Sequence, residues 1–405
     1  MANKTRKVKP HSEKKDASAT KVSVLRDPGQ MIPYVNFPKE KHQSVKTSGV
    51  KTVTLKPVRT EDQLKAREGT YWNEKEIETI YDEDIDVYVE DDKGGDKRLL
   101  ARFRKNVIPH DMLENAWVSF YKTAAPSRNR GAAAGPIDLQ SEYWKKRKPT
   151  QISKWSAKYV QNGKESKMRV NNNVFSSVLG YFEQTPFMGL PCRLTSYTQK
   201  YFQEFSQGTT FLEYIDKIFQ KLVPGPHAAQ LKQARVNPQY QIADTAFTSV
   251  TLNRNFRTAQ HQDAGDFRGG FGNLTVLEYG RYHGGCTVFP QYGVGFNIRT
   301  GDFIAMDVHT WHCNTEYTET AEDKEYNKKI PKIYDNNEST GTLGQDKPFT
   351  RISFVCYLRE KIPDCDTKET AKYYSSIGFK HKNGRLIPNQ KLPNYATRKK
   401  KRGDE

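Results

Sequence analysis

The fold is decided between residues 247 and 360, where short apolar segments alternate with glycine-rich turns. The segments read FTSVTLNRNFRTAQ (247–260), NLTVLEYG (273–280), GCTVFP (285–290), VGFNIR (294–299), DFIAMDV (302–308), WHCNTEY (311–317) and TRISFVCYLRE (350–360). Short strands at such close, regular spacing are typical of a sandwich or barrel. We therefore expect an all-β core in this part of the chain.

Two regions before this core show helical periodicity. Residues 107–122 carry apolar side chains at helical spacing, with Pro109 near the start. Residues 197–236 predict two or three helices with an apolar stripe between Phe211 and Leu222. Stripes of this kind usually serve core packing, so we expect supporting helices followed by a β core, an α+β fold.

Composition divides the rest of the chain. Residues 1–65 are rich in Lys, Ser and Thr and lack periodicity, which predicts a basic, largely disordered region. Residues 66–170 form an extension with an acidic patch at 80–97 and a basic, aromatic segment at 144–160. The helices and the β core occupy 171–360, and 361–405 is a basic tail ending in RKKKR (398–402).

The five cysteines are scattered and include no CxxC pair, so we expect mostly buried free thiols and no disulfide framework. No stretch approaches the roughly 20 apolar residues of a membrane helix, and the N-terminus lacks an apolar signal segment. The sequence predicts a soluble intracellular protein that is nuclear in a eukaryote and otherwise cytoplasmic or associated with viral or nucleoid DNA.

A net charge of +18 favours a polyanionic partner, with nucleic acid the first candidate. The run WKKRKPTQISKWSAKYV (144–160) mixes cations with aromatics, which suits phosphate contacts and base stacking. The candidate DNA contacts are Trp144, Lys145, Lys146, Arg147 and Lys148. A solvated loop with buried tryptophans would give the same pattern, and the sequence leaves both interpretations open.

The pair His261 and Asp263 follows the first segment of the β core. Residues i and i+2 on extended backbone point to one side, so both side chains can reach one ion. His312, after a turn, is the candidate third ligand, and we expect His309 to lie behind the ligands or in the wall of the pocket. Two imidazoles and one carboxylate on one face of an octahedron form the facial triad of non-haem iron(II) oxygenases. Zinc fits this set less well.

Arg351 and Ser353 share one face of the last β segment. A guanidinium grips a carboxylate through two parallel hydrogen bonds, and a hydroxyl two residues on can add a third. This pair therefore predicts a site for the distal carboxylate of 2-oxoglutarate, with O2 as the second co-substrate. Most arginines form ion pairs at the protein surface. The order HxD…H…RxS favours a carboxylate-binding role for Arg351 over such an ion pair.

The stretch from HQDAGDFRGG to WHCNTE (261–316), followed by RISFVCYLRE, resembles the TET/JBP dioxygenases, closest to their JBP-like and viral or algal branch. The resemblance covers roughly 185–360 and implies a double-stranded β-helix (jelly-roll) core holding Fe(II) and 2-oxoglutarate. It implies that His261, Asp263 and His312 bind the metal and that Arg351 binds 2-oxoglutarate. Asn253 and Asn255 match positions expected near the pocket. The polar stretch 318–348 is longer than in compact members.

The implied reaction is oxidation of the 5-methyl group of a DNA pyrimidine to hydroxymethyl, after base flipping and hydrogen abstraction. 5-Methylcytosine is favoured and thymine remains possible. Three alternatives stay open: an ascorbate-dependent 5-methylcytosine modifier, a prolyl or lysyl hydroxylase acting on protein, and a non-catalytic DNA-binding module. The complete triad speaks against the last of these.

Overall fold

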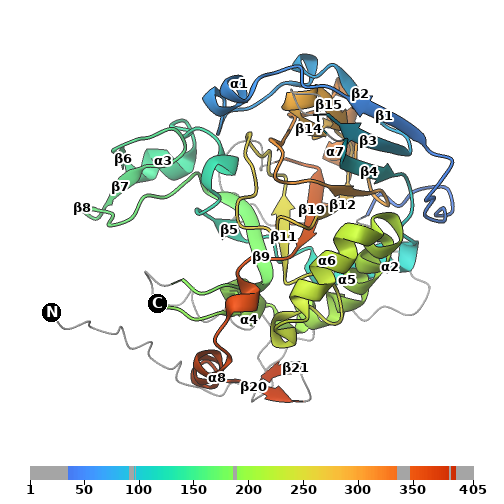
Figure 1. The fold of residues 1–405 in the computed structure, drawn as a ribbon. Helices are drawn as coiled ribbons and strands as arrows, with labels where there is room; N and C mark the ends of the chain where they lie inside the picture. Colours follow the sequence, from blue (N-terminus) through green and yellow to red (C-terminus); the bar gives the residue numbers. More distant parts are fainter. Residues whose placement is uncertain are drawn as a thin grey trace.

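The computed structural model describes residues 35–90, 95, 97–185, 189–334, 347–382 and 385–388. Its core is a mixed α+β arrangement around a ten-stranded sheet (Figure 1). In spatial order the strands are β1 (Lys51–Leu55), β3 (Ile85–Val89), β4 (Arg98–Arg104), β16 (Phe303–Met306), β12 (Gly272–Tyr279), β19 (Thr350–Tyr357), β11 (Ser249–Arg254), β9 (Val174–Phe182) and β10 (Arg193–Leu194), with β5 (Pro126–Ser127) paired to β9. β1 and β3 run parallel, whereas the strands from β3 to β10 pair antiparallel.

A second, smaller sheet contributes the other strands of the core. Its order is β17 (Cys313–Asn314), β14 (Thr287–Phe289), β15 (Val294–Phe296) and β2 (Thr79–Tyr81), and β13 (His283–Gly284) pairs separately with β18 (Tyr317–Thr318). Each segment predicted as a strand contains one, so the expected β-rich core is confirmed. The sequence did not predict that β1, β3, β4 and β9, all before residue 185, extend the main sheet.

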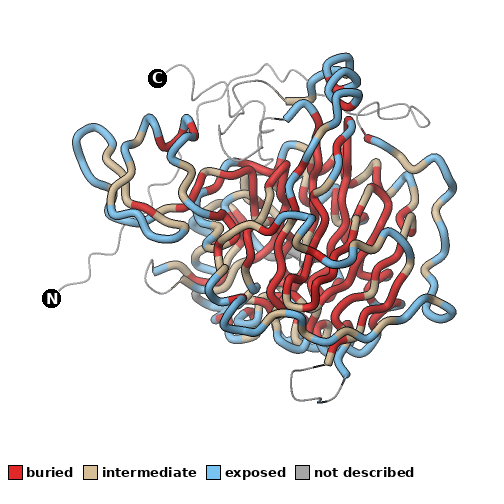
Figure 2. Tube along the Cα trace, turned by 90° about the horizontal axis from the view of Figure 1, so that it is seen from above, coloured by how far each residue is buried: buried red, intermediate tan, exposed pale blue. Residues whose placement is uncertain are grey.

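The two faces of β19 have different roles. Ile352, Phe354 and Cys356 belong to the largest apolar cluster, which includes the helices. Ser353 and Tyr357, on the opposite face, line a cavity. Because side chains alternate along a strand, one strand joins the packed core to the candidate site. Figure 2 shows the buried strands at the centre of the molecule and exposed loops at its rim.

Helices α2 (His110–Phe120), α4 (Ser196–Lys200), α5 (Phe202–Leu222) and α6 (Pro224–Ala234) contribute to this cluster, and the predicted helices are confirmed (Figure 1). The Phe354 ring lies 5.7 Å from that of Phe120 and 5.2 Å from that of Phe211. A Cβ at Gly208 would lie 2.1 Å from the Phe120 ring, so α2 and α5 can approach this closely only with glycine there. No described helix is long and apolar enough to cross a membrane.

Several smaller elements complete the described chain. They are α1 (Glu61–Ala66), α3 (Glu142–Arg147), β6 (Pro149–Thr150), β7 (Lys158–Gln161), β8 (Lys164–Glu165), α7 (Ala321–Lys329), α8 (Thr367–Ser376), β20 (Phe379–Lys382) and β21 (Arg385–Pro388).

The expected disorder of residues 1–65 is wrong in part, and part of the basic tail after residue 360 is folded. β1 pairs with β3, and Thr60 begins α1 with a capping box. Both elements are too short to be detected from the composition of this region. The tail contains α8 and the β20–β21 pair. Residues 1–34 and 389–405 lie outside the described residues, and so do 335–346 of the polar stretch, whose earlier part forms α7.

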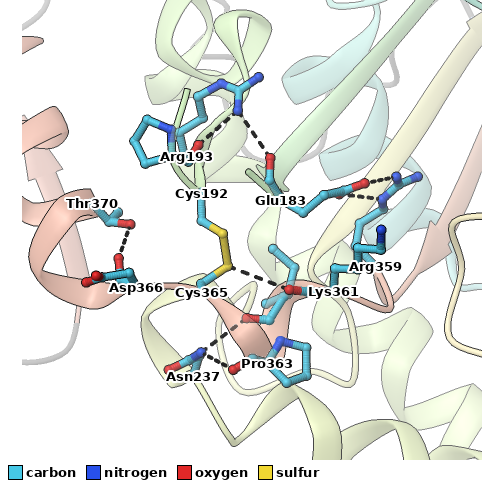
Figure 3. The surroundings of a disulfide bond; sticks show 12 residues. Glu183, Cys192, Arg193, Asn237, Arg359, Lys361, Pro363, Cys365, Asp366 and Thr370 are labelled. Carbon is cyan, nitrogen blue, oxygen red and sulfur yellow. Dashed lines mark hydrogen bonds and ion pairs between the residues drawn. A yellow bond between two sulfur atoms is a disulfide. The ribbon is translucent and has the colours of Figure 1, made fainter. Parts of the chain in front are cut away.

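The expectation of free thiols is wrong for two of the five cysteines. Cys192 and Cys365 form a disulfide that joins positions 173 residues apart, with Cα atoms 5.8 Å from each other (Figure 3). Such a separation leaves no spacing motif, so the sequence could not indicate the pair. Cys286, Cys313 and Cys356 are free and buried, as expected.

Candidate metal centre and cavity

His261 and His312 are held opposite each other by the backbone. The N–H of each donates to the C=O of the other at 3.0 Å, an isolated antiparallel bridge just before β17. Asp263 is fixed two residues on, where its N–H donates to the Val308 carbonyl at 3.1 Å. The extended backbone expected from the HxD spacing is therefore supplied by this bridge, because β11 itself ends at Arg254.

The three side chains converge as a metal site requires. One possible ligand atom from each lies within 4.8 Å of the others. Nε2 of His261 is 3.6 Å and Nε2 of His312 is 3.7 Å from the Asp263 carboxylate. Each Nδ1 faces a backbone carbonyl, Ala259 O at 2.8 Å and Thr310 O at 2.9 Å. Since a carbonyl only accepts, Nδ1 carries the proton and both Nε2 lone pairs are free for an ion.

The electrostatics favour the metal-binding forms of these groups. Burial, with His312 next to it, lowers the pKa of His261 to about 4, so the imidazole is neutral near pH 7. Burial alone would raise the pKa of Asp263, but His261, His312 and Arg130 hold it below its usual value. Neutral imidazoles and an ionised carboxylate are the forms in which these residues bind metal.

The trio opens into a cavity of about 260 Å³ between the two sheets. Its wall includes Leu274 from β12 and Ser353 from β19 on one side, and Thr287 from β14 and Asn314 from β17 on the other. Asn253 also lines it and donates to the Ser353 hydroxyl at 3.4 Å. The structure thus brings Ser353 and Asn253 together with the predicted metal ligands.

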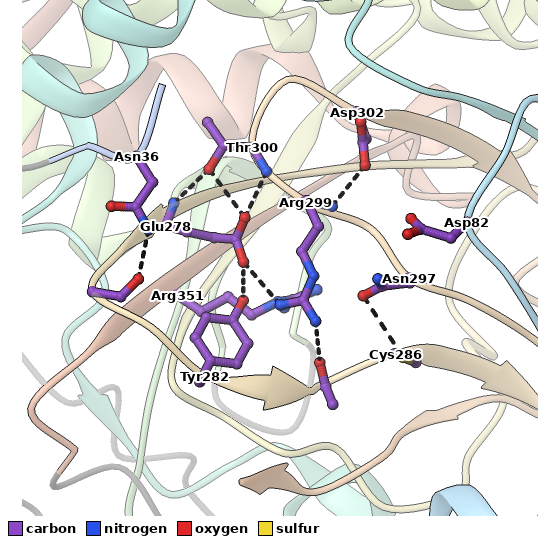
Figure 4. Close-up of polar contacts among 12 residues, drawn as sticks. Asn36, Asp82, Glu278, Tyr282, Cys286, Asn297, Arg299, Thr300, Asp302 and Arg351 are labelled. Carbon is purple, nitrogen blue, oxygen red and sulfur yellow. Dashed lines mark hydrogen bonds and ion pairs between the residues drawn. The ribbon is translucent and has the colours of Figure 1, made fainter. Parts of the chain in front are cut away.

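Arg351 lies two positions along β19 from Ser353 and is 3% exposed. Its cross-strand neighbour is Glu278 (Figure 4), but that carboxylate is occupied by other donors. Glu278 Oε1 accepts from Arg299 at 3.0 Å and from the Tyr282 hydroxyl, and Oε2 accepts from N–H and Oγ of Thr300. Nε and Nη2 of Arg351 are therefore buried without a hydrogen-bond partner among the described residues.

The structure places the other predicted pocket residues outside the metal trio. Asn255, in the left-handed region with φ 47°, bridges two strands: it accepts from the Arg351 N–H at 2.7 Å and donates to the Phe349 carbonyl at 2.9 Å. It thereby fixes the backbone that carries Arg351. His309 contacts the Asp266 carbonyl at 3.1 Å and the Asp307 carboxylate at 3.4 Å, consistent with a residue behind the metal site.

Three charged residues of the cavity were missed from the sequence. Asp266 is buried, and burial together with Asp263 raises its pKa well above the usual value. Arg359 pairs with Glu183 through Nε at 2.7 Å (Figure 3). Arg130 lines the cavity from the segment before α3. The motif HQDAGD (261–266) includes Asp266 and could have indicated that it lies near the metal ligands. No local sequence pattern indicates that Arg130 and Arg359 line the cavity.

The predicted DNA contact of Trp144 is wrong. Its indole is fully buried and donates to Asn172 Oδ1 at 2.9 Å, so it serves packing rather than base stacking. The neighbouring cations differ in exposure: Lys145, Lys146 and Lys148 are exposed, whereas Arg147 is half-buried over the Tyr143 ring at 4.0 Å.

Comparison with known proteins gives a consistent assignment. Residues 177–360 match the Tet_JBP family, described as the oxygenase domain of the 2OGFeDO superfamily. The bifunctional helicase and thymine dioxygenase JBP2 of Leishmania braziliensis is 34% identical over 185 residues, 45% of this chain and 14% of that protein. Thymine dioxygenase JBP1 of Trypanosoma brucei brucei is 37% identical over 143 residues, 35% of this chain and 17% of that protein.

Among solved structures, NgTET1 in complex with 5mC DNA aligns over 74% of this chain and 88% of that chain, with 12% identity and a TM-score of 0.42. The sequence relatives are much longer than the matched segment, which spans 14% of the JBP2 protein and 17% of the JBP1 protein.

The residues of the converging His-Asp-His trio lie within the segment that matches an oxygenase-domain family. More specifically, residues 177–360 are similar to the Tet_JBP family, the oxygenase domain of the 2OGFeDO superfamily. The family resemblance seen in the sequence is confirmed.

Proposed function

We propose that this protein is an Fe(II)- and 2-oxoglutarate-dependent dioxygenase that oxidises the 5-methyl group of a pyrimidine in DNA. The observation that carries the proposal is the buried guanidinium of Arg351, whose Nε and Nη2 have no hydrogen-bond partner among the described residues, on the strand whose Ser353 lines the cavity of the metal trio. An excess buried positive charge with free donors calls for a carboxylate. An oxygenase that used no carboxylate co-substrate, including an ascorbate-dependent one, would have no use for it.

The roles of the residues follow from their positions. His261, Asp263 and His312 would hold iron(II), and Arg351 with Ser353 would hold the distal carboxylate of 2-oxoglutarate. When bound, these two groups supply the oxidising chemistry that hydroxylates a methyl group. The protein orients the co-substrate through Asn253 on Ser353 and Asn255 on Arg351, and apolar wall residues such as Leu274 limit water.

The two sheets that enclose the cavity support a double-stranded β-helix within a 171–360 dioxygenase domain. One sheet provides β16, β12, β19 and β11, and the other provides β17, β14 and β15. The N-terminal strands β1, β3 and β4 extend the first of these sheets, so the proposed 66–170 extension is packed onto the core rather than separate from it.

A 5-methylpyrimidine is the proposed substrate because several sequence relatives are named thymine dioxygenases. A base inside a duplex cannot reach a cavity between two sheets, so the target nucleotide must be flipped out. The positive charge of the chain supports DNA as the partner.

The test is mass spectrometry of nucleosides after incubation with Fe(II), 2-oxoglutarate and DNA that carries either 5-methylcytosine or thymine as its only 5-methylpyrimidine. We expect a hydroxymethyl product from one of the two substrates and none from the His261→Ala, Asp263→Ala double variant. Absence of product from both substrates would reject the proposal and would leave a protein hydroxylase as the next candidate to assay.

A further inference from the structure

Residues 136–170 form a small unit, here called the arm, that projects from the main body (Figure 1). It contains α3 and the sheet β6–β7–β8, and it has its own apolar cluster of Tyr143, Trp144 and Ala157. Asn172 ties the arm to the body, because its amide donates to the carbonyls of Ala134 at 2.9 Å and Pro136 at 2.7 Å. The arm lies outside the segment that matches the oxygenase family.

The base of the arm forms part of the cavity wall. Asn129, Arg130 and Ala133, just before the arm, line the cavity with the metal trio. The chain leaving the arm is joined to the same segment, because Asn171 N–H donates to Arg128 O at 2.9 Å and Gly131 N–H donates to Asn171 Oδ1 at 2.8 Å. The arm therefore projects from the rim of the candidate active site.

The arm is strongly basic. It carries nine Lys and Arg against three Asp and Glu, a formal charge of +6 out of +18 for the whole chain. Glu142 and Glu165 pair with Lys145 and Lys158. Lys154, Lys164 and Lys167 are exposed and have no acidic partner among the described residues. One third of the net charge thus lies on about a tenth of the chain, beside the cavity.

The arm also exposes apolar side chains to solvent. Leu139, Ile152 and Met168 are 50%, 51% and 62% exposed, and they are half of the large hydrophobic residues exposed in the described chain. Arg169 donates to the Gln151 and Ser156 carbonyls, so the loop of Ile152 lies against the segment that carries Met168. Cations next to apolar side chains match the surface of nucleic acid, where phosphates alternate with sugars and base edges.

We propose that the arm binds the duplex next to the flipped nucleotide, with Lys154, Lys164 and Lys167 on backbone phosphates and Ile152 and Met168 against the sugars and base edges. The proposal rests on the proposed function, since it assumes that the cavity receives a base from DNA. The arm then makes the enzyme prefer a base with duplex on its flank over the same base in a very short strand.

The test compares full-length wild type with two triple variants that remove equal charge. The arm variant is Lys154→Ala, Lys164→Ala, Lys167→Ala. The control is Lys217→Ala, Lys221→Ala, Lys232→Ala, whose lysines are exposed on α5 and α6. Each phosphate contact contributes about 0.9 to the slope of log affinity against log salt, so the arm variant should lose about 3 from the slope for a long duplex. The control should keep the wild-type slope.

Turnover gives the second readout. For a long duplex with one 5-methylpyrimidine, kcat/KM of the arm variant should fall about tenfold or more, whereas for a trinucleotide with the same base it should equal wild type. An unchanged salt slope, or an equal loss on both substrates, overturns the role of the arm. If wild type oxidises neither substrate, the proposed function fails, and the salt slopes alone then decide whether the arm binds duplex.

Discussion

Replacing Arg351 by Met separates a binding role from a structural one. The guanidinium is buried, and its Nε and Nη2 lack partners among the described residues. Arg104 is the matched control. It is equally buried on β4, but it pairs with Asp86 at 2.7 Å and donates to three backbone carbonyls.

The two substitutions should change the free energy of unfolding in different ways, and only Arg351→Met should weaken binding of 2-oxoglutarate. Two charge-assisted hydrogen bonds to a carboxylate are worth about 1.5–3 kcal/mol each. Losing both raises KM for 2-oxoglutarate about 10²- to 10⁴-fold. Without co-substrate, removing unsatisfied buried donors should leave the free energy of unfolding of Arg351→Met unchanged or higher. Arg104→Met should instead lose about 3 kcal/mol, because a satisfied buried charge is removed from its partner.

The assay combines steady-state kinetics at varied 2-oxoglutarate with chemical denaturation of the metal-free proteins. Added 2-oxoglutarate with a redox-inert divalent metal should raise the Tm of wild type and of Arg104→Met, but not of Arg351→Met. The reasoning is refuted if Arg351→Met keeps the wild-type KM, or if it destabilises the metal-free protein as much as Arg104→Met does.

Three further predictions concern other parts of the structure. His261→Ala with Asp263→Ala should abolish turnover and iron binding while duplex affinity, measured by anisotropy, stays within about twofold; retained turnover would exclude this metal site. In chelator, the free energy of unfolding of wild type relative to His261→Ala should fall by about 3 kcal/mol as pH drops from about 6.5 to about 4, because the unfolded wild-type chain takes up a proton that folded His261, with its pKa of about 4, does not; an equal difference between the two proteins at both pH values would contradict this. Cys192→Ser should lower the free energy of unfolding by about 2–4 kcal/mol, since it opens the link to Cys365; equal stability of wild type with and without reductant would contradict this.

The metal trio could be predicted from local sequence patterns. Two of its ligands are close in sequence, and the third follows a segment that is recognisable as a strand. His261 and Asp263 are two residues apart, and a single backbone bridge brings His312 opposite them. Arg351 was predicted from its spacing to Ser353 on one strand. For Arg351 and Ser353 the alternation along β19 places both side chains on one face, and for His261 and Asp263 the extended backbone at the bridge to His312 does the same.

The remaining features depend on contacts between distant segments. Arg130 and Arg359 reach the same cavity from positions 229 residues apart in the sequence, and the Cys192–Cys365 pair spans 173 residues. Trp144 was predicted to stack on bases because it lies among cations in the sequence. Its burial and its hydrogen bond to Asn172 depend on a contact that composition does not reveal. β1 was not predicted because its sequence lacks a clear strand periodicity. Its strand conformation depends on hydrogen bonds to β3, which is distant in the sequence.

The pairing of β4 with β16 sets how the catalytic unit can be cut. Residues Ala101–Arg104 hydrogen-bond along Phe303–Met306, and Ile85 and Phe103 share a core cluster with Ile304. A fragment limited to the family-matched residues 177–360 would leave β16 as an unpaired edge strand with exposed apolar side chains. Edge strands of this kind pair with strands of other molecules and cause aggregation. The smallest soluble catalytic fragment should therefore begin before β1.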